Sequence, residues 1–390
     1  MPVLTDQGLA ALSFVNPHLT GSGLGREHAV VASTAPRRLP TAVRPLEVEF
    51  AGAGRMSDLP TFVEVTSTTS LLVLVDGVVL HEWYADGLGP TDLFLGASMT
   101  KSVLASLVGL AVDAGALALD DLVTGYVPEL GESGYAGVTV RQVASMTTGL
   151  DWVEDHRDPT SDASRLREVF ATSSGGSRQL LARLRPRFTP GTQYSYCTAD
   201  SQVLDWVRER ATGSDYVAAL TELWRDLGGT SDAVVGLDAA AEDGGVAMAG
   251  GSLAATARDW ARFALLQVDG VLGGRRLLSS SWVEASSRPA EPFLRPGRLP
   301  STITTHAGFG LHWWPLDDAG TRVAADGSRG QFLYVDRNTG VVVVKTSRWP
   351  YDEATDRQCR DLSYLALPAI AEAALRSPEP RPRPPAGAAP

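Results

Sequence analysis

The chain is poor in cysteine and has no long apolar run. Only Cys197 and Cys359 occur among its 390 residues, so we expect no disulfide framework and a reducing compartment. The start, Met1 to Asp6, lacks the basic residues and apolar run of a secretion signal. No apolar stretch reaches the ~18 residues that a membrane-spanning helix needs. We therefore expect a cytoplasmic protein that does not enter a membrane.

Basic residues are also scarce. Lys and Arg number 34 against 45 Asp and Glu, which gives a net charge of −11, and no basic stripe appears. We therefore expect a small-molecule partner rather than nucleic acid or a membrane surface. The oligomeric state stays open, with a homodimer as one option. No metal or other cofactor is expected, because the six histidines are not spaced like metal ligands: His18, His28, His81, His156, His306 and His312.

Hydrophobic residues make up 44% of the chain, which is enough for a substantial core. The length suits one large domain or two intimately joined domains. Residues 1–45 show no clear period and are predicted to form an irregular N-terminal arm. Residues 377–390 are rich in proline and are predicted to be a disordered tail.

Strand signals occur early and late in the chain, and helical signals fill the middle. Residues 71–75 and 78–84 predict a β-hairpin around an Asp76-Gly77 turn. Later strands are predicted at 311–314, 331–336 and 341–346, and helices at 120–128, 138–146, 201–211, 215–227, 254–268 and 361–375.

This order of elements indicates an α+β fold. An antiparallel sheet built from both ends of the chain and flanked by helices would accommodate a mainly helical insertion. We expect a sheet-plus-helix domain formed by 46–115 and 250–376, and an inserted helical domain over 116–249.

The most informative motif is Ser98-Met99-Thr100-Lys101, which opens a long apolar helix. Residues three apart share a helix face, so the side chains of Ser98 and Lys101 can meet. The helix start favours developing negative charge at Ser98, and burial would depress the pKa of Lys101 to make it a usable base. Taken alone, the motif is more typical of an ordinary helix start with an N-cap serine and a solvated lysine.

Two further segments carry residues with chemical potential. Tyr196 follows Tyr194 at an alternating position, which fits either packing against the core or a phenol whose phenolate a nearby ammonium stabilises. The segment 325–331 is rich in glycine and leads into a strand. It is either a plain surface turn or a strand that passes close to a reacting carbonyl and completes an oxyanion hole with the N–H of Ser98.

Together these segments resemble the penicillin-recognising serine hydrolases with the class C β-lactamase fold. More closely, the chain resembles the 6-aminohexanoate-dimer hydrolases (nylon-oligomer hydrolases) and their carboxylesterase relatives. The resemblance covers about residues 70–360 and rests on the stretches 98–101, 146–159, 196–199, 250–251, 256–259, 330–331 and 347–350.

The resemblance implies a β-lactamase/penicillin-binding-protein-like fold and a catalytic group. Ser98 would be the nucleophile, Lys101 its base partner and Tyr196 the proton relay to the leaving group. The backbone N–H groups of Ser98 and Ser328 would form the oxyanion hole.

The resemblance also implies substrate-binding positions, at which this chain departs from its relatives. β-Lactamases usually carry a cation where Ala325-Asp326-Gly327 stands here. Asp326 would repel the carboxylate of a β-lactam, which argues against that activity. His156 replaces a tyrosine of the nylon-oligomer hydrolases, and Gly250 replaces an asparagine. We expect these two changes to favour esters over amides, unless His156 is only a solvated loop residue.

We therefore predict a serine hydrolase that cleaves small esters or amides through an acyl-serine. A Ser-His-Asp hydrolase is disfavoured, because Thr100 stands where a Gly-x-Ser-x-Gly elbow needs glycine. A β-lactamase or D-alanyl-D-alanine peptidase-like enzyme and an inactive binding protein of the same fold stay open as alternatives.

Overall fold

The computed structural model describes residues 14–20, 24–52, 55–299, 307–350 and 352–376. Its largest sheet has six antiparallel strands in the order β11-β12-β13-β14-β4-β5. The early hairpin therefore pairs with the late strands, as the sequence predicts. The strands are β4 (Thr68–Val75), β5 (Val78–Tyr84), β11 (Trp314–Pro315), β12 (Arg322–Gly327), β13 (Gln331–Asp336) and β14 (Val341–Ser347).

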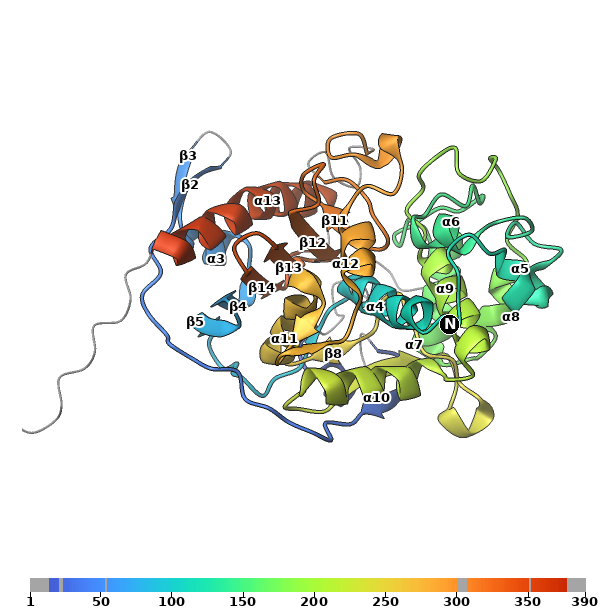
Figure 1. The fold of residues 1–390 in the computed structure, drawn as a ribbon, viewed down its shortest axis with the longest axis horizontal. Coiled ribbons are helices and arrows are strands. Elements are labelled where there is room, and N and C mark those ends of the chain that lie inside the picture. The colour runs from blue at the N-terminus through green and yellow to red at the C-terminus, as the bar shows by residue number, and fades with distance from the viewer. Residues whose placement is uncertain (1–13, 21–23, 53–54, 300–306, 351, 377–390) are drawn as a thin grey trace, which may run out of the picture.

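Alternate residues of the central strands enter two different cores. On β4, Leu72 and Leu74 face one core, and Leu71 and Val73 face the other. Helix α11 covers the first face, whereas α13 and α3 cover the second (Figure 1). Because both faces are covered, these strands are apolar throughout rather than alternating. The covering helices are α3 (Leu59–Val65), α11 (Ala257–Asp269) and α13 (Glu353–Arg376).

A second sheet joins the N-terminal part of the chain to its middle. Its order is β1-β7-β8-β6, and β1 pairs with β7 in antiparallel register. The prediction that 1–45 is irregular is therefore wrong for β1, because β7 offers an edge that local sequence does not reveal. These strands are β1 (Glu27–Val31), β6 (Phe94–Leu95), β7 (Ala233–Leu237) and β8 (Ala254–Ala255).

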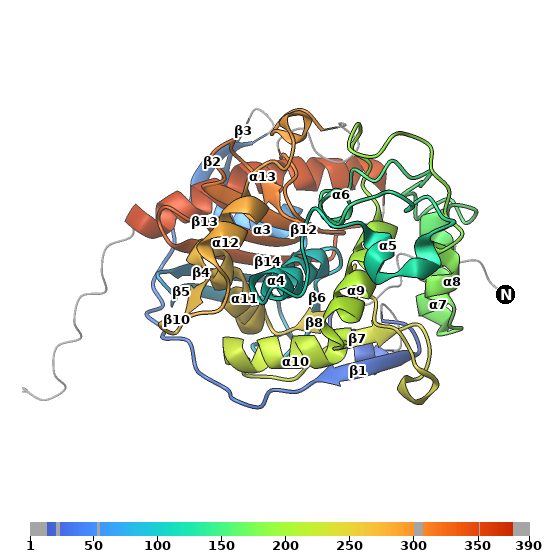
Figure 2. The ribbon, with the colours of Figure 1, turned by 45° about the vertical axis from the view of Figure 1, so that its right-hand side comes forward.

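Helix α4 (Met99–Asp113) runs through the centre of the molecule, between the large sheet and the helical part (Figure 2). Of its 15 residues, 12 are buried, as expected for a helix that is apolar on nearly all sides. It contacts α9, α10, α12, β12 and β13. The helical part comprises α5 (Val123–Tyr126), α6 (Val140–Ala144), α7 (Asp162–Thr172), α8 (Ser177–Leu181), α9 (Thr198–Thr212) and α10 (Tyr216–Leu227).

Several predicted elements differ from the structure. The helix predicted at 120–128 is only α5 and a 3-10 turn, and α9 begins three residues earlier than predicted. The strand expected at 311–314 is wrong except at Trp314, because His312 has a positive φ of 58°. Its ring nitrogens bond the Ala144 carbonyl (2.6 Å) and the Ser201 hydroxyl (2.9 Å), which turns the chain out of the sheet. Helix α11 begins only after Thr256, whose side chain caps it, and α13 starts eight residues earlier than predicted.

The remaining elements complete an α+β fold, as predicted. The division into domains at 116 and 249 stays a prediction, and the predicted tail 377–390 lies outside the described residues. No helix in the described ranges is long and apolar enough to cross a membrane. The remaining elements are α2 (Pro17–Thr20), β2 (Glu49–Gly52), β3 (Arg55–Asp58), β9 (Val271–Leu272), β10 (Arg275–Arg276), α12 (Ser280–Ser287) and the 3-10 turns Pro128–Leu130, Ala241–Asp243 and Pro292–Leu294.

Candidate active site

Ser98 stands at the N-cap of α4 and is partly exposed. The chain enters this position through Ala97, whose φ of 46° is unusual for a residue with a side chain. The Ser98 hydroxyl makes no capping bond and accepts a hydrogen bond from Lys101 Nζ at 3.1 Å. The serine side chain is therefore directed toward the lysine and not committed to the helix backbone.

Lys101 is buried, with 3% of its surface exposed. Besides Ser98, its ammonium group donates to the Gly250 carbonyl at 2.6 Å and lies 5.2 Å from the ring centre of Tyr196. Burial lowers the pKa of Lys101 to about 8, against the opposing charge of Glu154. The alternative of an ordinary helix start with a solvated lysine is therefore wrong.

Tyr196 lies against the same group of atoms and also packs in an aromatic cluster. Its ring stacks on Trp314 at 5.9 Å and meets the edge of Phe309 at 6.5 Å. Burial and the nearby Glu154 charge raise the pKa of Tyr196, while a hydrogen bond with Ser98 acts in the opposite direction. The alternative of a stabilised phenolate is therefore wrong for the resting side chain, because burial and the Glu154 charge favour the protonated phenol.

Glu154 is a site residue that the sequence reasoning missed. Its carboxylate accepts from Trp152 Nε1 (2.6 Å), from the Thr198 amide (2.8 Å) and from the Thr198 hydroxyl (2.6 Å). Burial by itself would raise the pKa of Glu154, but contact with His156, the Lys101 charge and Thr198 lower it to about 2. The sequence did place Glu154 within 146–159, one of the stretches on which the resemblance rests, and this could have identified it.

His156 lies beside Glu154 and lines the pocket. Its Nε2 atom is 3.2 Å from Glu154 Oε1, and 28% of its side chain is exposed. The next residue, Arg157, reaches from the same loop to Glu353 on α13 at 3.3 Å. The loop thus borders the pocket, and His156 is held by a carboxylate rather than freely solvated.

The glycine-rich segment 325–331 meets the turn that leads into Ser98. A Cβ on Gly327 would collide with the carbonyl oxygen of Gly96, so only glycine permits the approach of β12. The next backbone N–H, that of Ser328, has no hydrogen-bond partner among the described residues, nor does that of Ser98. Two backbone N–H groups on adjoining segments are therefore left without a partner among the described residues.

Gly250 lies against Lys101. Its carbonyl accepts from Lys101, and its N–H donates to Gln202 Oε1 at 3.0 Å. Gly250 and Gly327 are not among the described residues that line the pocket, whereas His156 and Asp326 are.

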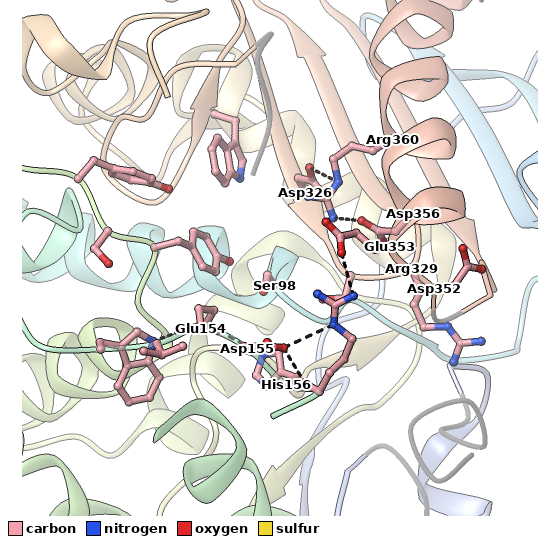
Figure 3. A pocket seen from close by; sticks show the side chains of 18 of the residues that line it. Ser98, Glu154, Asp155, His156, Asp326, Arg329, Asp352, Glu353, Asp356 and Arg360 are labelled. Atoms are coloured by element: carbon pink, nitrogen blue, oxygen red, sulfur yellow. Dashed lines mark hydrogen bonds and ion pairs between the residues drawn. The ribbon is translucent and has the colours of Figure 1, made fainter. Parts of the chain in front are cut away.

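The pocket around Ser98 has a volume of about 640 Å³. One wall is aromatic, and the other carries charged residues from β12 and α13 (Figure 3). Asp326 is not a free charge, because Arg360 lies 3.6 Å away and the Tyr364 hydroxyl donates to it at 3.0 Å. Nowhere in the described ranges do three His, Cys, Asp or Glu side chains gather as metal ligands do. The aromatic residues that line the pocket are Trp152, Tyr194, Tyr196 and Trp314.

The arrangement can perform covalent chemistry. A serine hydroxyl, a buried amine and a phenol lie together, with unbonded backbone N–H groups beside the serine. Such a set can transfer an acyl group to the serine oxygen and stabilise the oxyanion formed on the way.

Comparisons with known proteins show the family to which the chain belongs. The beta-lactamase family model matches residues 62–367. A 6-aminohexanoate-dimer hydrolase of Paenarthrobacter ureafaciens is 33% identical over 331 residues, which is 82% of each chain. A provisionally named 6-aminohexanoate-dimer hydrolase of Bacillus anthracis has a TM-score of 0.75 at 20% identity, covering 93% of this chain and 96% of that one. A family VIII carboxylesterase has a TM-score of 0.56 at 18% identity, covering 79% and 96%. The chain is therefore a hydrolase of the beta-lactamase family.

Proposed function

We propose that this protein cleaves small carboxylic esters and linear amides through an acyl intermediate on Ser98. The observation that carries the proposal is the contact of a buried Lys101 with the Ser98 hydroxyl at 3.1 Å, beside a protonated Tyr196. A lysine with a pKa of about 8 is partly neutral at pH 7 and can accept the serine proton.

Acylation begins when neutral Lys101 takes the proton of Ser98 and the serine oxygen bonds the substrate carbonyl carbon. The carbonyl oxygen then becomes an oxyanion, which the N–H groups of Ser98 and Ser328 bind. Tyr196 gives its proton to the departing alkoxide or amine and regains one from the Lys101 ammonium. The C–O or C–N bond breaks, and the acyl group remains on Ser98.

Deacylation repeats these steps with water. Lys101, again neutral, takes a proton from water through Tyr196, and the hydroxide attacks the acyl carbon. Collapse of the second oxyanion breaks the bond to Ser98, which recovers its proton from Lys101. The products are a carboxylic acid and the alcohol or amine released earlier.

The relatives and the pocket support the proposed substrate class. The curated relative is named for 6-aminohexanoate dimer, a linear amide, and one structural neighbour is a carboxylesterase. A β-lactamase or peptidase activity is the second candidate, since the family model bears that name. It is disfavoured because the late-strand position holds Asp326, paired with Arg360, rather than an available cation.

A substrate panel with an active-site variant tests the proposal. p-Nitrophenyl butyrate, 6-aminohexanoate dimer and nitrocefin are compared for the wild type and Ser98→Ala. We expect turnover of the ester, weaker turnover of the dimer, little of nitrocefin, and none by Ser98→Ala. Mass spectrometry of the digested protein should detect an acyl adduct on the peptide that contains Ser98. Wild-type ester activity in Ser98→Ala would refute the mechanism.

A further inference from the structure

One guanidinium in the pocket wall is held between two carboxylates. Arg360 Nη2 lies 3.1 Å from Asp356 Oδ2, and Arg360 Nε lies 3.6 Å from Asp326 Oδ2. Asp326 also accepts from the Tyr364 hydroxyl at 3.0 Å. All three charged groups line the pocket that contains Ser98 (Figure 3). We call this group the Asp326–Arg360–Asp356 clamp.

Burial raises the pKa of Asp326, and the Arg360 charge opposes this shift. With both carboxylates ionised, the clamp carries a net negative charge that solvent screens poorly. Two carboxylates surround one guanidinium, and the side chains of Asp326 and Arg360 are only 6% and 18% exposed. Asp356 is 34% exposed, so an oxygen of the clamp can meet a ligand. Charges held away from water interact over longer distances than surface charges, so a substrate in the pocket senses this excess.

The other charged groups that line the pocket do not reverse the sign of its net charge. Six carboxylates and three guanidinium groups line it among the described residues. Arg157 is paired with Asp155 at 3.5 Å and with Glu353 at 3.3 Å. Arg329 donates from Nε to the Trp349 carbonyl at 2.6 Å. Each guanidinium therefore already has partners in the protein.

We propose that the Asp326–Arg360–Asp356 clamp makes this pocket select esters and amides that carry an ammonium group over those that carry a carboxylate. Asp326 keeps Arg360 from pairing with a substrate carboxylate, and Asp356 presents an oxygen that an ammonium can approach. The inference rests on the proposed hydrolase function and adds the charge of its substrates.

Esters matched in length and leaving group test the selection. The p-nitrophenyl esters of hexanoic acid, 6-trimethylammoniohexanoic acid and adipic acid differ chiefly in the charge at the far end of the acyl chain. A second pair, butyrylcholine and 3,3-dimethylbutyl butyrate, places the charge on the alcohol. We expect kcat/KM for the cationic acyl ester to exceed that for the anionic one by about tenfold or more, and 1 M salt to reduce this ratio.

Variants that each remove one negative charge show which residues cause the charge selection. Relative to the neutral ester measured with the same variant, Asp356→Asn and Asp326→Asn should each raise kcat/KM for the adipate ester and lower it for the cationic ester. Asp356→Asn is the safer variant, since the Asp326 carboxylate is more deeply buried. Glu372→Gln is the matched control, because it makes the same charge change on α13 outside the pocket.

The outcomes separate the two proposals. Charge selection that Asp356→Asn weakens and Glu372→Gln leaves intact supports the clamp. If Ser98-dependent turnover of the neutral ester is normal but neither series depends on charge, the clamp proposal is wrong and the hydrolase proposal stands. Selection that survives both clamp variants also overturns the clamp. Absence of Ser98-dependent turnover would instead defeat the hydrolase proposal.

Discussion

Gly327 lies so close to the carbonyl oxygen of Gly96 that no side chain fits between them. Gly96 lies two residues before Ser98, and Gly327 ends β12, directly before Ser328. The contact therefore fixes the spacing between the two backbone N–H groups, on Ser98 and Ser328, that are proposed to bind the oxyanion.

Gly327→Ala should separate these two segments. We expect kcat/KM for p-nitrophenyl butyrate to fall by about 100-fold, the scale of losing one oxyanion donor. Steady-state kinetics should show that most of the loss is in kcat. Thermal unfolding should show a lower Tm, because the added methyl group strains the contact. Gly89→Ala is the control, since a Cβ at Gly89 would meet no atom within 4 Å. If kcat is unaffected in Gly327→Ala, the contact between Gly327 and Gly96 does not contribute to catalysis.

The activity should depend on the protonation of Lys101. Its pKa is about 8 because burial disfavours the ammonium form, and only the neutral amine accepts the Ser98 proton. We therefore expect kcat/KM for a neutral ester to rise with pH and to level off above pH 8. A pH-rate profile measures this, and a rate that falls across this range would contradict a lysine base.

Glu154→Gln should move that profile to lower pH. The Glu154 charge raises the pKa of Lys101, so its removal makes the amine neutral at lower pH. Thr198→Val is the matched control, because it removes a hydrogen-bond partner of Glu154 without changing a charge. Thr198→Val should lower kcat without moving the midpoint. Equal profiles for Glu154→Gln and the wild type would exclude electrostatic tuning by Glu154.

Lys101 and Tyr196 should act as a unit. Lys101→Ala and Tyr196→Phe are each expected to lower kcat by about two to four orders of magnitude, the usual scale for acid–base groups. The double variant should lose much less than the product of the single losses, because both residues serve one proton path. Multiplicative losses would mean separate roles, and a nearly silent Tyr196→Phe would leave only its packing on Trp314.

His156→Tyr should favour amide cleavage. An amide nitrogen must receive a hydrogen bond and a proton as it departs, whereas a p-nitrophenolate leaves readily. We expect kcat/KM for 6-aminohexanoate dimer to rise and that for p-nitrophenyl acetate to change little. Parallel changes for both substrates would mean that His156 acts through Glu154, its 3.2 Å partner, and not on the leaving nitrogen.

Local sequence determined the strands, most helices and the pairing of Ser98 with Lys101. Spacing of three along a helix brings two side chains together whatever surrounds them. Likewise, continuous apolar runs such as β14 identify buried strands, because a sheet covered on both faces has no solvent side. These features depend on residues that are close in sequence, so the sequence alone predicts them.

Tertiary structure alone decided the chemistry of these residues. The pKa of Lys101 depends on burial and on Glu154, and its second acceptor, the Gly250 carbonyl, is 149 residues away. The pairing of Asp326 with Arg360 joins a strand to a helix and removes the free acid that the sequence indicates. Burial and long-range contacts arise only when distant segments pack, so no local pattern could have supplied them.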